Sequence, residues 1–212
     1  MFSNKGMKKI TTIALPILLA LANIFSPATA HSAAAVSPLS VGIVPPIQFP
    51  SDEFTVTGLR ISALWGRHRD MYGLDFGAIG NITDQTFTGI GLSGLFNINS
   101  GATTIFLLQG AGVTNYSNQK TEVYGLQIAG GMNWVTAESK VVGLQVALAG
   151  NHSPNTTVYG AQLGLYNRAR EVYGFQIGLV NFTKNLHGIQ IGLMNFNETG
   201  VFGVSPILNI GF

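Results

Sequence analysis

The chain has 212 residues, of which 11 are Lys or Arg, 9 are Asp or Glu and none is Cys. The lack of cysteine excludes disulfide bonds, a thiolate nucleophile and cysteine-ligated metals. Only 9% of the residues are charged, against about 25% in ordinary globular domains, and no cluster of Lys and Arg predicts a nucleic-acid partner.

Residues 1–30 are predicted to form a secretory signal peptide. Lysines precede an apolar run at residues 10–25, and a small-residue cleavage site follows it. The run is shorter than the roughly 20 residues of a membrane-spanning helix. Cleavage before His31 would remove three lysines and leave the exported chain near neutral. We expect this chain in the cell outer membrane or, alternatively, at the cell surface or outside the cell.

Residues 31–54 are predicted to form a Pro-rich N-terminal arm, because Pro45, Pro46 and Pro50 disfavour a regular helix or a central strand. Residues 55–212 are predicted to form one domain of about ten similar units, separated by 14 to roughly 20 residues. The pattern is weakest at residues 101–120. The clearest units begin at Gly58, Gly73, Gly89, Gly125, Gly143, Gly160, Gly174 and Gly188.

Each unit alternates between two kinds of side chain over about nine residues, which predicts a β-strand. Small or polar residues occupy one face of such a strand, as Gln176 does, and large apolar residues occupy the other. The Asn-rich segments between units predict turns. In the unit at Gly174, the apolar face consists of Tyr173, Phe175, Ile177 and Leu179.

Two folds can bury these apolar faces. They point inward in a soluble β-solenoid or sandwich, or outward into lipid in a closed barrel. Charged residues are nearly absent from the strands and lie in the turns, which favours the barrel. A tilted strand of nine residues spans roughly 23 Å, close to the apolar band of about 25 Å in outer-membrane barrels.

We therefore predict an all-β fold, an antiparallel up-and-down transmembrane β-barrel of about ten strands, with a β-solenoid of short repeats as the alternative. The uneven spacing of the units favours the barrel, whereas the nearly constant last steps keep the solenoid open. In the expected antiparallel register, Gln176 lies opposite Gly192 and Gln190 lies opposite Gly178. Each glutamine would then fold over a glycine and fill a narrow lumen.

The units GLQIAGGMN, GAQLGLYN, GFQIGLVN and GIQIGLMN, with VPPIQFP before them and SPILNIGF after them, resemble a family of bacterial surface-repeat proteins that carry a G-L-Q-L-G-L-V-N octet. The resemblance covers about residues 41–212. It implies a surface location and a barrel-like shape but no activity. The terminal Phe212 resembles the signal that hands outer-membrane proteins to the barrel-assembly machinery, which implies this machinery and outer-membrane lipid as partners.

No catalytic, cofactor-binding or metal-binding residue is predicted, and we expect no enzymatic activity. The glycines of residues 89–94 match G-x-G-x-x-G, but the strand, helix and acidic residue of a dinucleotide site are missing. The N-x-S/T sites follow from Asn and Thr in turns; among them are those that begin at Asn81, Asn115, Asn155, Asn181 and Asn197. The histidines lie in the arm or near turns, without metal-ligand spacing, at His31, His68, His152 and His187.

Arg60 and Asp75 stand apart, because they occupy the position that glutamine holds in later units. If the first hairpin turns at Arg67 and His68, Arg60 and Asp75 face each other across the lumen, where an ion pair stabilises a plug, closes a channel or lines one. The sequence thus predicts a small outer-membrane barrel with a structural or narrow-pore role. The alternative is a secreted or surface-attached β-solenoid that acts in adhesion or surface interaction.

Overall fold

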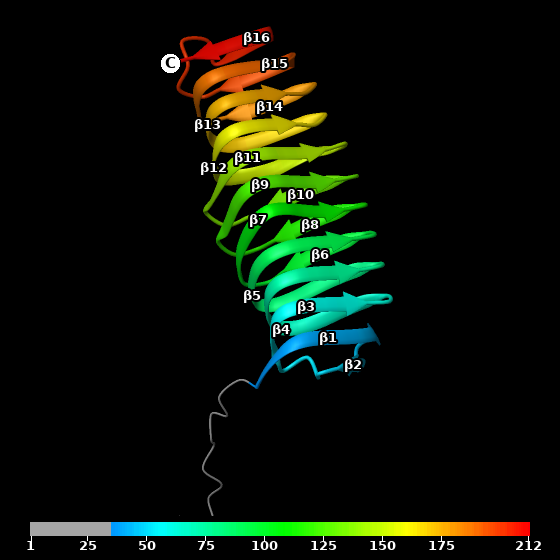
Figure 1. Cartoon of the computed structure of the whole chain (residues 1–212). Coiled ribbons are helices and arrows are strands. Elements are labelled where there is room, and N and C mark those ends of the chain that lie inside the picture. Colours follow the sequence, from blue (N-terminus) through cyan, green and yellow to red (C-terminus); the bar gives the residue numbers. More distant parts are fainter. Residues whose placement is uncertain (1–34) are drawn as a thin grey trace, which may run out of the picture. The chain divides into compact units, whose positions relative to one another are not determined.

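The computed structural model describes residues 35–212, so the predicted signal peptide and His31 lie outside the described residues. Residues 35–212 form a mostly parallel β-solenoid of about ten turns, in which successive coils stack along one axis from β1 to β16 (Figure 1). The strands join into one 16-stranded sheet that winds around the interior. The described residues include no helix that could span a membrane.

Each coil has two sides, which we name after the amide residue that each turns inward. The glutamine side contains β3 (Thr55–Ser62), β7 (Ala102–Ala111), β9 (Thr121–Ala129) and β11 (Ser139–Ala147). The asparagine side contains β6 (Phe96–Asn99), β8 (Thr114–Ser117), β10 (Met132–Val135) and β14 (Val180–Thr183). The strands that bend around a corner and contribute to both sides are β4 (Trp65–Gly77), β5 (Gly80–Ser93), β12 (Gly150–Leu163), β13 (Tyr166–Ile177) and β15 (Asn185–Asn197).

Shorter strands close the two ends of the stack. At the first coil, β1 (Val36–Val44) pairs in parallel with β3, and β2 (Ile47–Phe49) folds back on β1 as an antiparallel partner. At the last coil, β16 (Val204–Gly211) pairs antiparallel with β15. The Pro-rich segment therefore supplies the first rung of the solenoid, with Pro45 and Pro46 between β1 and β2.

The predicted antiparallel barrel is wrong, because consecutive repeat units lie in parallel and in register. Gly174 pairs with Gly188 and Gln176 pairs with Gln190, so each residue stacks on its own equivalent, and neither Gln176 nor Gln190 faces the glycine expected in the barrel. The fold is the β-solenoid that was predicted as the alternative. Its strands nevertheless turn the glutamine face inward and the apolar face outward, as was expected for the barrel. Gln176 is fully buried, whereas the side chain of Phe175 is exposed.

The expected narrow lumen is also wrong, because side chains fill the interior. One buried column is apolar and runs through Val56, Met71, Phe87, Ile105, Val123, Val141, Val158, Val172 and Leu186. Beside it lie the inward amides of Asn and Gln, most of which are fully buried. A channel cannot pass through an interior that is packed in this way.

The repeated glycine of each unit follows from the close approach of neighbouring coils. Gly143 has φ +133°, and a Cβ atom there would collide with the carbonyl oxygen of Gly125 in the preceding coil. An L-residue is strained at this φ even without the collision. The glycines therefore reflect backbone geometry, which also accounts for Gly89 in the G-x-G-x-x-G segment, with φ +151°.

Candidate functional site

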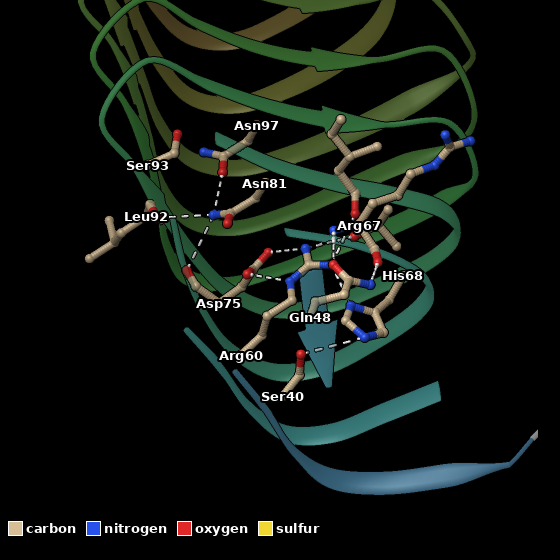
Figure 2. A network of polar contacts seen from close by, with 12 residues as sticks. Ser40, Gln48, Arg60, Arg67, His68, Asp75, Asn81, Leu92, Ser93 and Asn97 are labelled. Carbon is tan, nitrogen blue, oxygen red and sulfur yellow. Dashed lines mark hydrogen bonds and ion pairs between the residues drawn. The ribbon is translucent and has the colours of Figure 1, made fainter. Parts of the chain in front are cut away.

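Arg60 and Asp75 form a buried ion pair, which confirms that the two residues face each other. Nε of Arg60 donates to Oδ1 of Asp75 at 2.7 Å, and Nη2 donates to Oδ2 at 2.6 Å. The pair arises from parallel stacking of β3 on β4, so the predicted hairpin at Arg67 and His68 is wrong. Figure 2 shows the guanidinium enclosed by side chains from several coils.

His68 belongs to the same network and is fully buried in β4. Its Nδ1 lies 3.3 Å from Nη1 of Arg60, and its Nε2 lies 3.4 Å from Oγ of Ser40 (Figure 2). Burial, followed by the charge of Arg60, lowers the pKa of His68 to about 4. Because Arg60 can only donate, Nδ1 of the neutral ring accepts and Nε2–H donates to Ser40.

The ion pair fills part of the interior of the first coils. Arg60 occupies space next to Gly66, where later coils carry an inward asparagine, and its Nη1 also donates to the carbonyl oxygen of Ile82 at 3.0 Å. A bidentate pair with these extra hydrogen bonds satisfies charges that would be costly to bury alone. Arg60, Asp75 and His68 are all buried inside the first coils, where a substrate cannot reach them.

Inward asparagines form a continuous ladder on the asparagine side, beginning at Asn81. Each Nδ2 donates to Oδ1 of the next coil at 2.8 to 3.0 Å, through Asn97, Asn115, Asn133, Asn151, Asn167, Asn181 and Asn195. Sequence reasoning missed this ladder and assigned these residues to turns. The recurrence of Asn at steps of 14 to 18 residues was the signal that could have revealed it.

A second ladder runs on the glutamine side in the opposite direction. Each Nε2 donates to Oε1 of the preceding coil at 2.7 to 2.9 Å, and Asn209 of β16 continues the column by donating to Gln190 at 3.1 Å. The two ladders point their amide dipoles oppositely along the stack. The glutamines in this ladder are Gln109, Gln127, Gln145, Gln162, Gln176 and Gln190.

The remaining histidines do not converge on a site. Within residues 35–212, no group of three or more His, Asp or Glu side chains is placed to hold a metal ion. His152 lies against Trp134, with ring centroids 4.9 Å apart, and His187 stacks on Tyr173 at 4.5 Å. Burial lowers the pKa of His152, with a smaller effect from Arg168. Both rings therefore belong to aromatic columns on the exterior.

Charged side chains gather along one corner of the coils, where the asparagine side leads into the glutamine side. We call this corner the charged edge. Apart from Arg60 and Asp75, every Asp, Glu, Lys and Arg in residues 35–212 lies in it. Its segments are residues 50–55, 67–70, 83–86, 99–103, 117–122, 135–140, 153–157, 168–171, 183–185 and 197–200.

The other corner of each coil carries no charged residue, and we call it the uncharged edge. Large apolar side chains recur there from coil to coil and are exposed, among them Leu95, Val113, Leu165, Leu179 and Leu193. Its segments are residues 62–65, 77–80, 93–96, 111–114, 129–132, 147–150, 163–166, 177–180 and 191–194. The solenoid is thus amphipathic across its coils, with charge on one long edge and apolar surface on the other.

Aromatic rings line the exterior beside the charged edge on both sides, and we call them the aromatic belt. The hydroxyl of Tyr124 donates to Glu122 at 3.1 Å, and Nζ of Lys140 lies 5.3 Å from the ring centroid of Tyr159. Their polar groups therefore meet the charged edge while their rings extend the apolar surface. The belt consists of Tyr72, Phe106, Tyr124, Tyr159 and Tyr173 on the glutamine side and Tyr116 and Trp134 on the asparagine side.

Comparison with protein-family models, curated proteins and solved structures gives no significant match for this chain. The expected membership in the octet-repeat family with a barrel-like shape is therefore wrong: no family model matches, and the chain is a parallel solenoid with stacked amide ladders. The porin-like role that accompanied it is wrong for the same structural reason, since the interior is filled.

Proposed function

We propose that this chain is an exported, non-catalytic β-solenoid that attaches to the cell envelope by its exterior and acts in surface interaction. One observation carries the proposal: the polar amides are turned inward, while exposed apolar side chains cover the uncharged edge. A contiguous exposed apolar patch of this kind is often an interaction site.

Two further features support a binding role over an enzymatic one. The strongest polar network, around Arg60 and Asp75, is sealed inside the stack and its hydrogen bonds are satisfied by neighbouring coils. Hydrolytic or transfer chemistry would require reactive groups that a substrate can reach. The stacked coils instead provide a long, regular exterior, as solenoid proteins use for binding.

The proposed location follows from the signal peptide predicted at residues 1–30. Export would place the solenoid where envelope surfaces are available, at the outer membrane or on the outside of the cell. Recognition of the last strand by the barrel-assembly machinery stays a prediction, with β16 serving as the cap of the stack.

Co-sedimentation with isolated Gram-negative envelopes tests the proposal. A chain that begins at His31 retains every described strand and can be mixed with envelopes and centrifuged. We expect it in the pellet with envelopes and in the supernatant without them. Full recovery in the supernatant would overturn the proposed attachment, and cytosolic retention of the complete chain during expression would overturn the proposed export.

A further inference from the structure

We infer that the uncharged edge is a lipid-binding edge that inserts into one leaflet of a phospholipid membrane and leaves the charged edge in water. This inference rests on the proposed function and names the partner of the apolar exterior. Four physical features of the described coils carry it: the backbone hydrogen bonding, the exposed side chains, the position of the aromatic belt and the narrowness of the edge.

The backbone at the uncharged edge is suited to an environment without water. Peptide groups exposed to hydrocarbon are costly unless the protein itself satisfies them. Here the corner N–H groups donate to the neighbouring coil: Leu179 to Leu165 at 2.9 Å, Leu95 to Ile79 at 2.7 Å, and Val113 to Leu95 at 2.8 Å. Stacking therefore removes corner N–H groups from the surface and leaves mainly side chains to meet a partner.

The side chains at this edge are apolar and exposed. Leu165 is 52% exposed, Leu179 is 48% exposed and Leu193 is 66% exposed. The three leucines and Ile207 help to line a groove of about 380 Å³. Transfer of such side chains from water to hydrocarbon is favourable and requires no specific partner geometry.

The aromatic belt on the asparagine side lies at the depth expected for a membrane interface. Trp134 is two residues from Met132 at the uncharged edge, or roughly 7 Å at about 3.3 Å per residue, and interfacial insertion of apolar side chains reaches about 5 to 10 Å. Immersion to this depth places Trp134 among the headgroups, where Trp is enriched, at the level of Arg168 two coils further along. Tyr124, which is five residues from Ala129 on the glutamine side, then lies above the hydrocarbon together with the charges beside it.

A lipid surface fits this edge better than a second copy of the chain. Stacked coils repeat every 4.7 to 4.9 Å, so nine corners make an edge of roughly 40 Å by about 10 Å, or about 400 Å². Stable protein interfaces bury about 800 Å² on each partner and carry a polar rim with hydrogen bonds. The edge has neither the area nor the rim.

The two tryptophans of the chain provide a test of depth. Trp65 lies at the uncharged edge and Trp134 lies in the aromatic belt. In phosphatidylcholine vesicles with bromine deep in the acyl chains, W134F should show strong quenching of Trp65, and W65F should show weak quenching of Trp134. Bromine near the headgroups should reverse the order. Equal quenching of both, or none of either, would overturn the insertion of this edge.

Vesicle flotation with the chain that begins at His31 tests the edge by substitution. The double variant Leu165→Asp/Leu179→Asp should reduce the vesicle-bound fraction more than tenfold, because a charge at each corner opposes insertion. The matched control is Phe202→Asp, at an exposed residue in the loop before β16, which should bind like the parent chain. Circular dichroism of all three proteins checks that they are folded.

The outcomes separate this inference from the proposed function. Binding to envelopes without binding to phosphatidylcholine vesicles would overturn the lipid inference, leave surface interaction standing and indicate a macromolecular partner. Failure to bind either would overturn both. Equal vesicle binding by the double variant and the control, or a solution dimer that only the double variant dissociates, would also reject the lipid edge. Binding that persists at high salt is expected, since acidic and basic residues are nearly balanced at the charged edge.

Discussion

The substitution Asn151→Ala should show how much a single rung of the asparagine ladder contributes to stability. Asn151 is fully buried in the middle of the stack. Its Nδ2 donates to Oδ1 of Asn167 at 2.8 Å, to the carbonyl oxygen of Leu163 at 3.0 Å and, at a longer 3.4 Å, to that of Gln145, and its Oδ1 accepts from Asn133 at 2.8 Å. Alanine removes all four hydrogen bonds and leaves their partners in place.

The magnitude follows from the partners that are left buried. Oδ1 of Asn167 loses its side-chain donor and the carbonyl oxygen of Leu163 loses a donor, whereas Nδ2 of Asn133 keeps the carbonyl oxygen of Val146 at 3.0 Å. Each newly unsatisfied buried group costs about 1 to 3 kcal/mol. The free energy of unfolding should therefore fall by about 3 to 5 kcal/mol, with the cavity of the missing amide included.

The exposed Asn155 provides a matched control on the same strand. Its Nδ2 makes one hydrogen bond, to the carbonyl oxygen of Thr136 at 2.8 Å, so Asn155→Ala should cost about 1 kcal/mol or less. Urea denaturation followed by circular dichroism measures both variants, with the m-values compared to confirm a common transition. If Asn151→Ala and Asn155→Ala destabilise within 1 kcal/mol of each other, the reasoning about the ladder fails.

Three further substitutions probe other parts of the stack. Arg60→Ala leaves Asp75 buried without its partner, so thermal unfolding should show a loss of about 3 to 5 kcal/mol; a loss below 1 kcal/mol would contradict the importance of the pair. His68 has a pKa of about 4 in the folded chain and about 6.5 when unfolded, so the unfolded chain takes up a proton first as the pH falls. Its contribution, roughly 3 kcal/mol, should be lost between about pH 6.5 and pH 4, and His68→Gln should flatten this part of the stability profile relative to the parent chain. Gly143→Ala should cost at least about 2 kcal/mol in chemical denaturation, because of its positive φ and the carbonyl of the preceding coil, whereas Gly203→Ala, with open space around it, should be nearly neutral; equal effects would count against coil spacing as the reason for the glycine.

The strands, their two faces and one specific contact could be predicted from the sequence. Strict alternation predicted the β-strands, and the scarcity of charge on the face that carries Gly, Ala and Gln indicated that Gln176 points inward and Phe175 outward, as the structure has them. The contact of Arg60 with Asp75 was also predicted, although from a hairpin that the structure does not contain. These features are visible because they depend on residues within one unit, or on equivalent positions of two units.

Strand direction could not be obtained in the same way. Side chains alternate between the two faces of a strand in parallel and antiparallel sheets alike. Alternation alone therefore could not distinguish the barrel from the solenoid. The varying spacing of the units was wrongly interpreted as evidence for the barrel. The residues that vary in number between units lie in loops at the charged edge. Between Glu122 and Lys140 the repeat takes 18 residues, and between Gln176 and Gln190 it takes 14, yet both pairs remain in register.

By itself, the sequence determined an all-β chain with an apolar exterior and an amide-rich interior. Only the tertiary structure decided that each unit stacks in parallel on the next, that the asparagines assigned to turns form a buried ladder, and that charge lies on one edge alone. The physical reason is that stacking depends on how the two corners of a coil close. Once they close, Asn meets Asn and Gln meets Gln across neighbouring coils, and every turn brings its charges to the same edge.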